Sequence, residues 1–209
     1  YSPLGTAVAL SPLAVPLLIL SPLSAWYLPR LGLRFVVFTG LMLMAIGLLG
    51  MRGLAVDASY AELAWPLLVM STGVGLFTAP TTSAIMTSAP DDKQGVASAV
   101  NDTTREMGAA LGIALAGSML AARYTHEIMP ALGRYPEPLR TAAAGSIGEA
   151  LNAATRLGSN GTDLAFAAKM SFLYAMQGSL TVLAIVTAGA AVLISMFAPG
   201  RDGKALFRR

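Results

Sequence analysis

Long apolar stretches separated by short polar ones dominate the pattern of this sequence. Five apolar stretches approach the roughly 20 residues that a helix needs to cross a bilayer. They lie at about 4–27, 35–51, 63–89, 96–122 and 178–197. A membrane β-barrel needs alternating strands of about ten residues, and the sequence lacks them. The pattern therefore predicts an all-α membrane protein with about five transmembrane helices.

The first apolar stretch contains three prolines, Pro12, Pro16 and Pro22. Proline has no backbone N–H, so each one frees the carbonyl oxygen four residues earlier in a helix. Membrane helices tolerate this when neighbouring groups satisfy the freed carbonyls. The sequence therefore predicts a kinked first helix.

The longest polar segment, 123–162, is expected to form a loop outside the membrane. Apolar residues recur in it at spacings of three and four, at Leu139, Ala143, Ile147, Leu151 and Ala154. This spacing predicts one amphipathic helix at a surface, with Gly158 as its stop. The last helix is expected to begin near Asp163 and end before Pro199, which is longer than a bilayer is thick.

Composition supports the membrane interpretation. The chain is 55% hydrophobic and 12% charged, whereas soluble domains carry about a quarter charged residues. Its net charge of +3 is scattered along the chain and predicts no nucleic-acid partner. The absence of cysteine excludes disulfides and thiolate chemistry.

The positions of arginine and lysine predict the orientation of the helices. Basic residues are densest in three short segments, 28–34, 90–95 and 200–209. Short basic loops stay in the cytoplasm. We therefore expect a multi-pass plasma-membrane protein with transmembrane helices within 1–199 and a cytoplasmic basic tail at 200–209. Segments 52–62 and 123–162 then lie outside.

Catalytic and metal-binding patterns are weak in this sequence. His126 is the only histidine, and no second ligand lies at metal spacing. Neither an enzyme nor a cofactor is therefore expected. The stretch "GVGLFT" lies within an apolar run, where small residues such as Gly73 and Gly75 indicate close helix packing.

The stretch "VNDTTREMGAALGIAL" is unusual because it places three charged residues inside an apolar segment. Arg105 lies ten residues from Gly95, or roughly 15 Å along a helix. That is about half of a hydrocarbon core of roughly 30 Å. A charge at the bilayer centre costs about 2.5–3.5 kcal/mol on insertion scales. These charges therefore need partners or water.

A helical projection places polar and small residues of this stretch on one stripe, at Asn101, Arg105, Gly108, Gly112 and Ala116. Gly108 and Gly112 would let another helix approach closely. Asp102 is three residues from Arg105 and is expected to pair with it. Two interpretations stay open: an ion pair that anchors the helix, or a lining for a substrate or proton path. The path would use Asn101, Asp102, Thr104, Arg105 and Glu106, with Glu106 as the least matched acid.

The opening stretch "YSPLGTAVALSPLAVPLLILSPLSAWYLPRLGLR" resembles a second-half helix and loop of major facilitator superfamily transporters. It is most similar to the fourteen-helix drug:proton antiporter branch, the EmrB/QacA type. Arg30, Gly32 and Arg34 fit the end of the loop motif of that branch. Pro29 stands where the motif has aspartate.

Two further stretches carry the resemblance. "GVGLFTAPTTSAIMTSAP" is similar to the Gly-rich helix of the family, with Pro80 at the expected place. "QGVASAVNDTTREMGAALGIALAGSML" is similar to the next helix. The recurring polar and small positions of that helix correspond to Asn101, Thr104, Arg105, Gly108 and Gly112.

The resemblance implies the last five helices of a second half-domain of a bacterial inner-membrane transporter. Such a protein would export small amphipathic or drug-like molecules, with protons as the coupling ion. Its partners would be the lipid bilayer and the missing N-terminal half of the same transporter. Two other classes stay open: a non-transporting membrane anchor or subunit, and a membrane-embedded enzyme.

Overall fold

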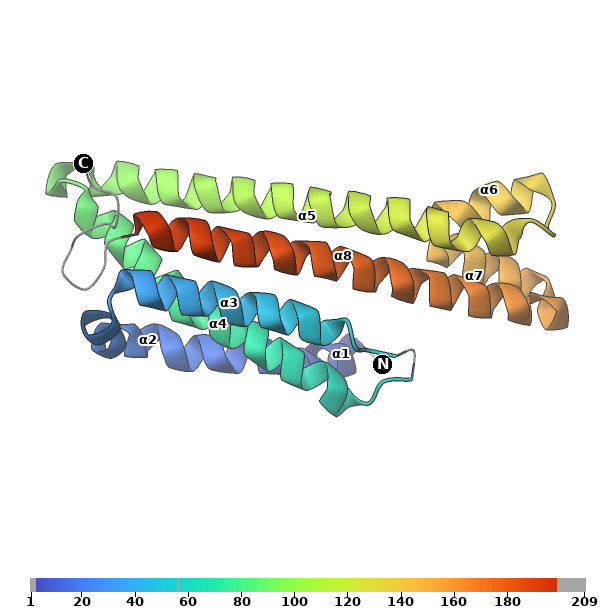
Figure 1. Cartoon of the computed structure of the whole chain (residues 1–209), viewed down its shortest axis with the longest axis horizontal. Coiled ribbons are helices and arrows are strands. Elements are labelled where there is room, and N and C mark those ends of the chain that lie inside the picture. Colours follow the sequence, from blue (N-terminus) through green and yellow to red (C-terminus); the bar gives the residue numbers. More distant parts are fainter. Residues whose placement is uncertain (1–2, 56, 199–209) are drawn as a thin grey trace. The chain divides into compact units, whose positions relative to one another are not determined.

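The computed structural model describes residues 3–55 and 57–198 (Figure 1). The described residues form α-helices joined by short turns, without strands. The helices are α1 (Pro3–Ala9), α2 (Ala14–Leu31), α3 (Leu33–Met51), α4 (Tyr60–Ser88), α5 (Gln94–Leu132), α6 (Glu137–Gly145), α7 (Ile147–Arg156) and α8 (Thr162–Phe197). In this described part, five helical segments are long and apolar enough to cross a membrane. The prediction of an all-α, multi-pass membrane protein is confirmed.

The chain divides into two compact units. The first is drawn from Tyr1–Met51, Ser59–Ala109 and Leu183–Arg209, and the second from Arg52–Ala58 and Ala110–Val182. Helices α5 and α8 each run from one unit into the other. The predicted tail at 200–209 lies outside the described residues.

Helix α4 contacts both α2 and α3 in the first unit, and glycines make both contacts close. A Cβ atom on Gly40 of α3 would lie 2.7 Å from the carbonyl oxygen of Gly73. A Cβ atom on Gly75 would lie 3.1 Å from the carbonyl oxygen of Pro16 and 3.2 Å from the Cα atom of Leu17. Gly73 therefore packs against α3 and Gly75 against α2, because residues two apart point to different sides of a helix.

The predicted kink in the first span takes the form of a helix break. Ser11–Leu13 forms a 3-10 turn between α1 and α2. Pro16 cannot donate to the carbonyl oxygen of Pro12. The hydroxyl of Ser71 in α4 lies 3.3 Å from that oxygen and 3.2 Å from the carbonyl oxygen of Leu68, so its one proton is shared between the two acceptors. A neighbouring helix thus satisfies a carbonyl that proline has freed.

The predicted basic turn at 28–34 is helical except at one residue. Helix α2 continues to Leu31 and α3 starts at Leu33. Gly32 separates them with a φ of 78°, a left-handed conformation that glycine adopts without steric cost. A single glycine therefore turns the chain here, where the sequence predicted a longer loop.

The prediction of one amphipathic helix within 123–162 is wrong. Helix α5 continues to Leu132, and two separate helices, α6 and α7, follow. Ser146 between them is extended, and its hydroxyl accepts the backbone N–H of Glu149 as the N-cap of α7. The apolar spacing continues through this position, but the helix does not, because the capping serine starts a new helix.

The second unit has its own apolar core, built from α5, α6, α7 and α8. Its buried residues are Tyr124, Ile128, Leu132, Ala143, Ala144, Ala150, Ala154, Leu164, Ala168 and Ala175. Tyr124 and Thr125 of α5 donate hydrogen bonds to the carbonyl oxygens of Ala143 and Ala144, over 3.1 and 3.0 Å. These bonds satisfy carbonyls at the end of α6 that lack helical partners.

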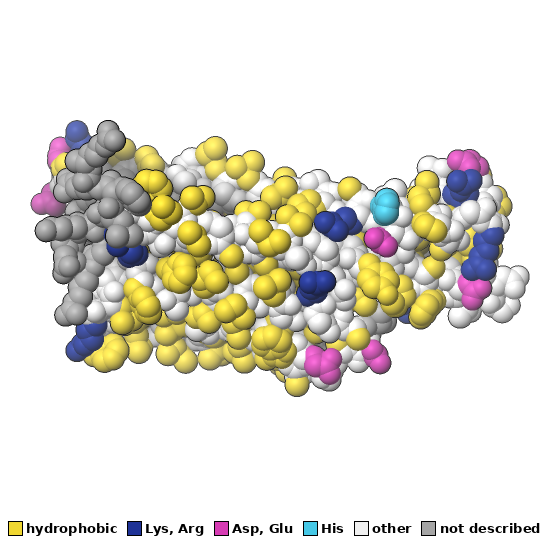
Figure 2. Space-filling view, in the orientation of Figure 1, with side chains coloured by type: hydrophobic (Ala, Val, Ile, Leu, Met, Phe, Trp, Pro, Cys, Tyr) yellow, Lys and Arg dark blue, Asp and Glu magenta, His cyan; other side chains and the backbone are white. Residues whose placement is uncertain are grey.

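Exposed side chains differ between the helices. Large apolar side chains of α2 are exposed, among them Val15, Leu18, Ile19 and Trp26, as suits a helix that faces lipid. Charged side chains gather around α6 and α7 on the face that Figure 2 shows. Gly158, the predicted stop, has a φ of 60° and lies two residues after α7 ends at Arg156.

Candidate functional site

A pocket of about 560 Å³ lies between α4 and α5 in the first unit. Ten residues line it: Val74, Phe77, Thr78, Thr81, Thr82, Ile85, Val100, Asn101, Thr104 and Arg105. The turn at Pro90–Lys93 joins the two helices, so their facing sides come from one helical hairpin.

The α5 wall of this pocket contains three of the five residues expected on a transport path. Asn101, Thr104 and Arg105 line the pocket, whereas Asp102 and Glu106 do not. The three lining residues fall at spacings of three and four, which places them on one side of the helix. The predicted residues are therefore divided between the pocket and the remaining surface of α5.

The expected ion pair between Asp102 and Arg105 does not form. The Asp102 carboxylate instead accepts a hydrogen bond from the side-chain amide of Asn101 over 3.3 Å. Within the described chain, the ion pairs are His126–Glu127, Arg134–Asp163 and Arg140–Glu137. The guanidinium of Arg105 is therefore available to a ligand of the pocket, because no described residue pairs with it.

The α4 wall carries three threonines that sequence reasoning missed. Thr78, Thr81 and Thr82 donate their hydroxyl protons to the carbonyl oxygens of Val74, Phe77 and Thr78, over 2.6, 2.7 and 3.0 Å. Each hydroxyl oxygen keeps lone pairs that can accept a hydrogen bond. Their spacing in "FTAPTT" is the signal that could have found them, since residues three and four apart share a helix face.

The pocket combines apolar and polar walls. Val74, Phe77, Ile85 and Val100 supply apolar surface, while the threonines, Asn101 and Arg105 supply hydrogen-bonding groups. Ligand sites for small organic molecules have this combination of apolar lining and a few polar groups. The arrangement fits an amphipathic molecule that presents a hydrogen-bond acceptor or negative charge to Arg105.

Glycines expected at helix contacts fall into two groups. Gly73 and Gly75 lie at the α4 contacts described above, and the fully buried side chain of Pro80 lies on the same helix. A Cβ atom on Gly108 or Gly112 of α5 would meet no described atom within 4 Å. These two glycines offer a smooth surface that another helix could approach.

The predicted loop-motif residues lie around the break between α2 and α3. Arg30 lies over the ring of Trp26 at 4.2 Å and donates to the carbonyl oxygen of that residue over 2.7 Å. The Nε atom of Arg34 donates to the carbonyl oxygen of Ala198 over 2.9 Å. Arg34 thus connects the start of α3 with the residue that follows α8 in the first unit.

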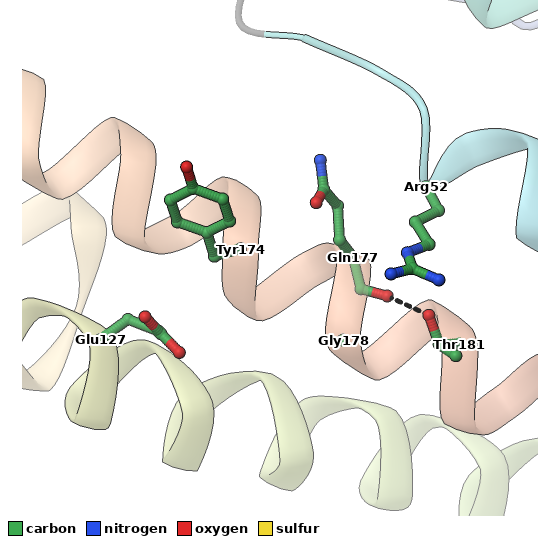
Figure 3. A pocket seen from close by; sticks show the side chains of 6 residues that line it. All are labelled: Arg52, Glu127, Tyr174, Gln177, Gly178 and Thr181. Carbon is green, nitrogen blue, oxygen red and sulfur yellow. Dashed lines mark hydrogen bonds between the residues drawn. The ribbon is translucent and has the colours of Figure 1, made fainter.

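A second pocket, of about 350 Å³, lies within the second unit (Figure 3). Arg52, Glu127, Tyr174, Gln177, Gly178 and Thr181 line it. Sequence reasoning missed this site because its residues come from separate segments with no shared motif. Clusters of three or more residues that could hold a metal ion do not occur in the described ranges.

Comparison with known proteins gives relatives named for drug resistance or export. The chain is 32% identical over 141 residues to the multidrug resistance protein Stp of Mycobacterium tuberculosis. It is 28% identical over 161 residues to the multidrug efflux pump LfrA of Mycolicibacterium smegmatis. It is 26% identical over 205 residues to the tetracenomycin C resistance and export protein of Streptomyces glaucescens. No family model matches the chain.

These similarities cover most of this chain but a minor part of each relative. They extend over 67%, 77% and 93% of the chain, and over 26%, 32% and 36% of the respective relatives. The chain therefore spans about a quarter to a third of the length of these proteins. It is similar to part of bacterial multidrug resistance and efflux transporters.

Proposed function

We propose that this chain is the C-terminal part of a major facilitator superfamily transporter of the fourteen-helix drug:proton antiporter branch. The complete protein exports small amphipathic molecules across the bacterial inner membrane and couples export to proton entry. The observation that carries the proposal is the α4–α5 pocket, which combines unpaired Arg105 with apolar and hydroxyl-bearing walls. Similarity to export proteins over up to 93% of the chain supports it.

In this proposal the pocket forms one wall of the substrate path. Transporters of this kind bind substrate between two halves and expose it alternately to each side. The open surface at Gly108 and Gly112 then faces a helix of the missing N-terminal half. The five membrane-spanning segments of this chain are expected not to transport by themselves, because the opposite wall of the path belongs to the other half of the transporter.

Proton coupling is the finer part of the proposal. Glu106 is exposed and takes part in none of the ion pairs of the described chain. It adjoins Arg105 in sequence but lies outside the pocket lining. We assign Glu106 a proton-sensing role beside the substrate path, which predicts a shifted pH profile of transport in Glu106→Gln.

The test uses the full-length transporter and measures efflux of a fluorescent amphipathic substrate. Arg105→Ala is expected to lower efflux about tenfold to a hundredfold, because hydrogen bonds to a charged group contribute about 1.5–3 kcal/mol. Thr81→Val is expected to lower it about threefold to tenfold, as for a neutral hydrogen bond.

Two matched variants control for folding and membrane level. Thr87 makes the same hydroxyl bond to the residue four positions earlier in α4 but does not line the pocket. Arg156 is an exposed arginine of α7. Thr87→Val and Arg156→Ala are expected to transport normally. Normal efflux in both pocket variants contradicts the proposed path and favours a membrane anchor or subunit.

A further inference from the structure

The pocket of the second unit lies where three helices leave their apolar segments. Arg52 directly follows the last residue of α3, an apolar helix of 19 residues. In α5, Arg123 follows the apolar segment predicted at 96–122. Gly178, a lining residue, begins the apolar segment predicted at 178–197 in α8. Lining residues Arg52 and Gly178 thus stand in the sequence at the ends of predicted apolar segments, where a membrane helix reaches the level of the lipid head groups.

The pocket has a positive end. Arg52 points toward the end marked by Thr181 in Figure 3. The Arg123 side chain packs against Gly178, where an added Cβ atom would lie 3.0 Å from the Cζ atom of Arg123. Neither guanidinium forms an ion pair or a hydrogen bond with any residue in the described part of the chain. Guanidinium groups bind phosphate oxygens through paired hydrogen bonds.

The opposite end of the pocket is negative. Figure 3 shows Glu127 toward the Tyr174 end, away from Arg52. The ion-pair partner of Glu127 is His126, which carries a charge only when it is protonated; its Nδ1 atom lies 3.9 Å from the carboxylate, and both side chains are exposed. Such a surface pair contributes little. The Glu127 carboxylate and the face of the Tyr174 ring can therefore both receive an ammonium group.

From these two ends we propose that the pocket binds a phosphoethanolamine group, with the phosphate at Arg52 and Arg123 and the primary ammonium at Glu127. Gln177 lines the space between the ends, and Thr181 lies at the end of Arg52. The Thr181 hydroxyl donates to the carbonyl oxygen of Gln177 over 2.7 Å, which leaves its oxygen free to accept. The group can be the head group of a zwitterionic phospholipid or a free molecule. This inference does not rest on the proposed function, because binding can be measured without transport.

The experiment measures lipid binding to the purified full-length protein by native mass spectrometry. Phosphatidylethanolamine carries both charges of the proposed ligand, phosphatidylglycerol lacks the ammonium, and phosphatidylcholine has an ammonium that cannot donate hydrogen bonds. The unmodified protein is expected to retain phosphatidylethanolamine in preference to the other two. Equal retention of all three lipids overturns the proposal without any variant.

Substitutions then test the two ends of the pocket separately. Arg52→Gln is expected to weaken retention of both phosphatidylethanolamine and phosphatidylglycerol about tenfold, as the loss of a charge-assisted contact. Glu127→Gln is expected to remove only the preference for phosphatidylethanolamine over phosphatidylglycerol. Arg156→Gln and Glu149→Gln, exposed charges of α7 outside the pocket, are the matched controls. Wild-type retention of both lipids in Arg52→Gln, or a wild-type preference for phosphatidylethanolamine in Glu127→Gln, overturns the proposal.

Free phosphoethanolamine distinguishes the two sources of the group. It is added to lipid-free protein in detergent, and the melting temperature is compared with that after addition of phosphatidylethanolamine. A rise with the lipid alone assigns the pocket to a membrane head group. An equal rise with the free molecule, lost in Arg52→Gln, assigns it to a soluble ligand of the same chemistry. No rise with either overturns the proposal.

Discussion

The hydroxyl of Tyr27 in α2 donates a hydrogen bond of 2.9 Å to the carbonyl oxygen of Leu76 in α4. This is the carbonyl that Pro80 leaves without a helical partner, since proline has no N–H to offer four residues later. The Tyr27 side chain is buried, with 6% of its surface exposed. In the opposite direction, Ser71 of α4 donates to the carbonyl oxygen of Pro12. The first apolar segment, which comprises the 3-10 turn and α2, and helix α4 therefore each offer a hydroxyl to a carbonyl that a proline has freed in the other.

Tyr27→Phe is expected to destabilise the folded protein by about 1–2 kcal/mol, because it leaves the carbonyl oxygen of Leu76 unsatisfied in an apolar setting. Restoring a backbone donor with Pro80→Ala should lessen that cost. A double-mutant cycle of Tyr27→Phe and Pro80→Ala, measured by reversible unfolding in micelles, gives the coupling between the two positions. Additive effects of the two substitutions would show that the hydroxyl and the proline act independently.

Gly40→Ala is expected to force α3 and α4 apart, because the new Cβ atom would lie 2.7 Å from a backbone oxygen that cannot rotate away. We expect a loss of about 1–3 kcal/mol, as for an overpacked core, read as a lower melting temperature. Gly189→Ala in α8 is the matched control, since its Cβ atom would meet no described atom within 4 Å. Equal melting temperatures for the two variants would contradict the close contact.

Gly108→Leu is expected to abolish transport in the full-length protein while leaving these five helices folded. No described atom lies within 4 Å of a Cβ atom added at Gly108, so the leucine side chain fits within this chain. It would, however, block the approach of a helix from the other half of the transporter. Efflux by the full-length protein and its circular dichroism spectrum are the two measurements. Unimpaired efflux would show that no helix packs against this surface.

Membrane orientation can be tested with single cysteines, since the chain has none of its own. Asn160 lies in an exposed 3-10 turn after α7, and Asp92 in the exposed turn before α5. The distribution of basic residues predicts that an impermeant thiol reagent labels Asn160→Cys in intact cells and Asp92→Cys only after permeabilisation. The reverse pattern of labelling would invert the predicted orientation.

Residue types and their periodicity were enough to predict the membrane fold and most helix positions. The apolar runs are long because a helix that crosses lipid must be apolar along its length and satisfies its backbone internally. That requirement is local, so it is visible without tertiary contacts. The last helix begins at Thr162, next to the expected start near Asp163, for the same reason.

The sequence could not predict which polar groups meet. Asp102 and Arg105 are spaced for an ion pair, but the carboxylate accepts from Asn101 instead, because spacing permits a pair without fixing side-chain rotamers. Ser146 lies between two positions of a regular apolar pattern and does not interrupt that pattern, yet it ends one helix and caps the next.

Tertiary packing alone decided the two pockets and the partners of the freed carbonyls. Thr81 of α4 and Arg105 of α5 line one pocket because the turn at Pro90–Lys93 reverses the chain between the two helices. Arg52 and Glu127 are 75 positions apart in the numbering and share a pocket through the folding of the second unit. Likewise, the sequence shows that Pro80 frees a carbonyl, whereas only the packing of α2 on α4 brings the Tyr27 hydroxyl to it. The physical reason is that local sequence fixes which groups need partners, and three-dimensional proximity fixes which groups become those partners.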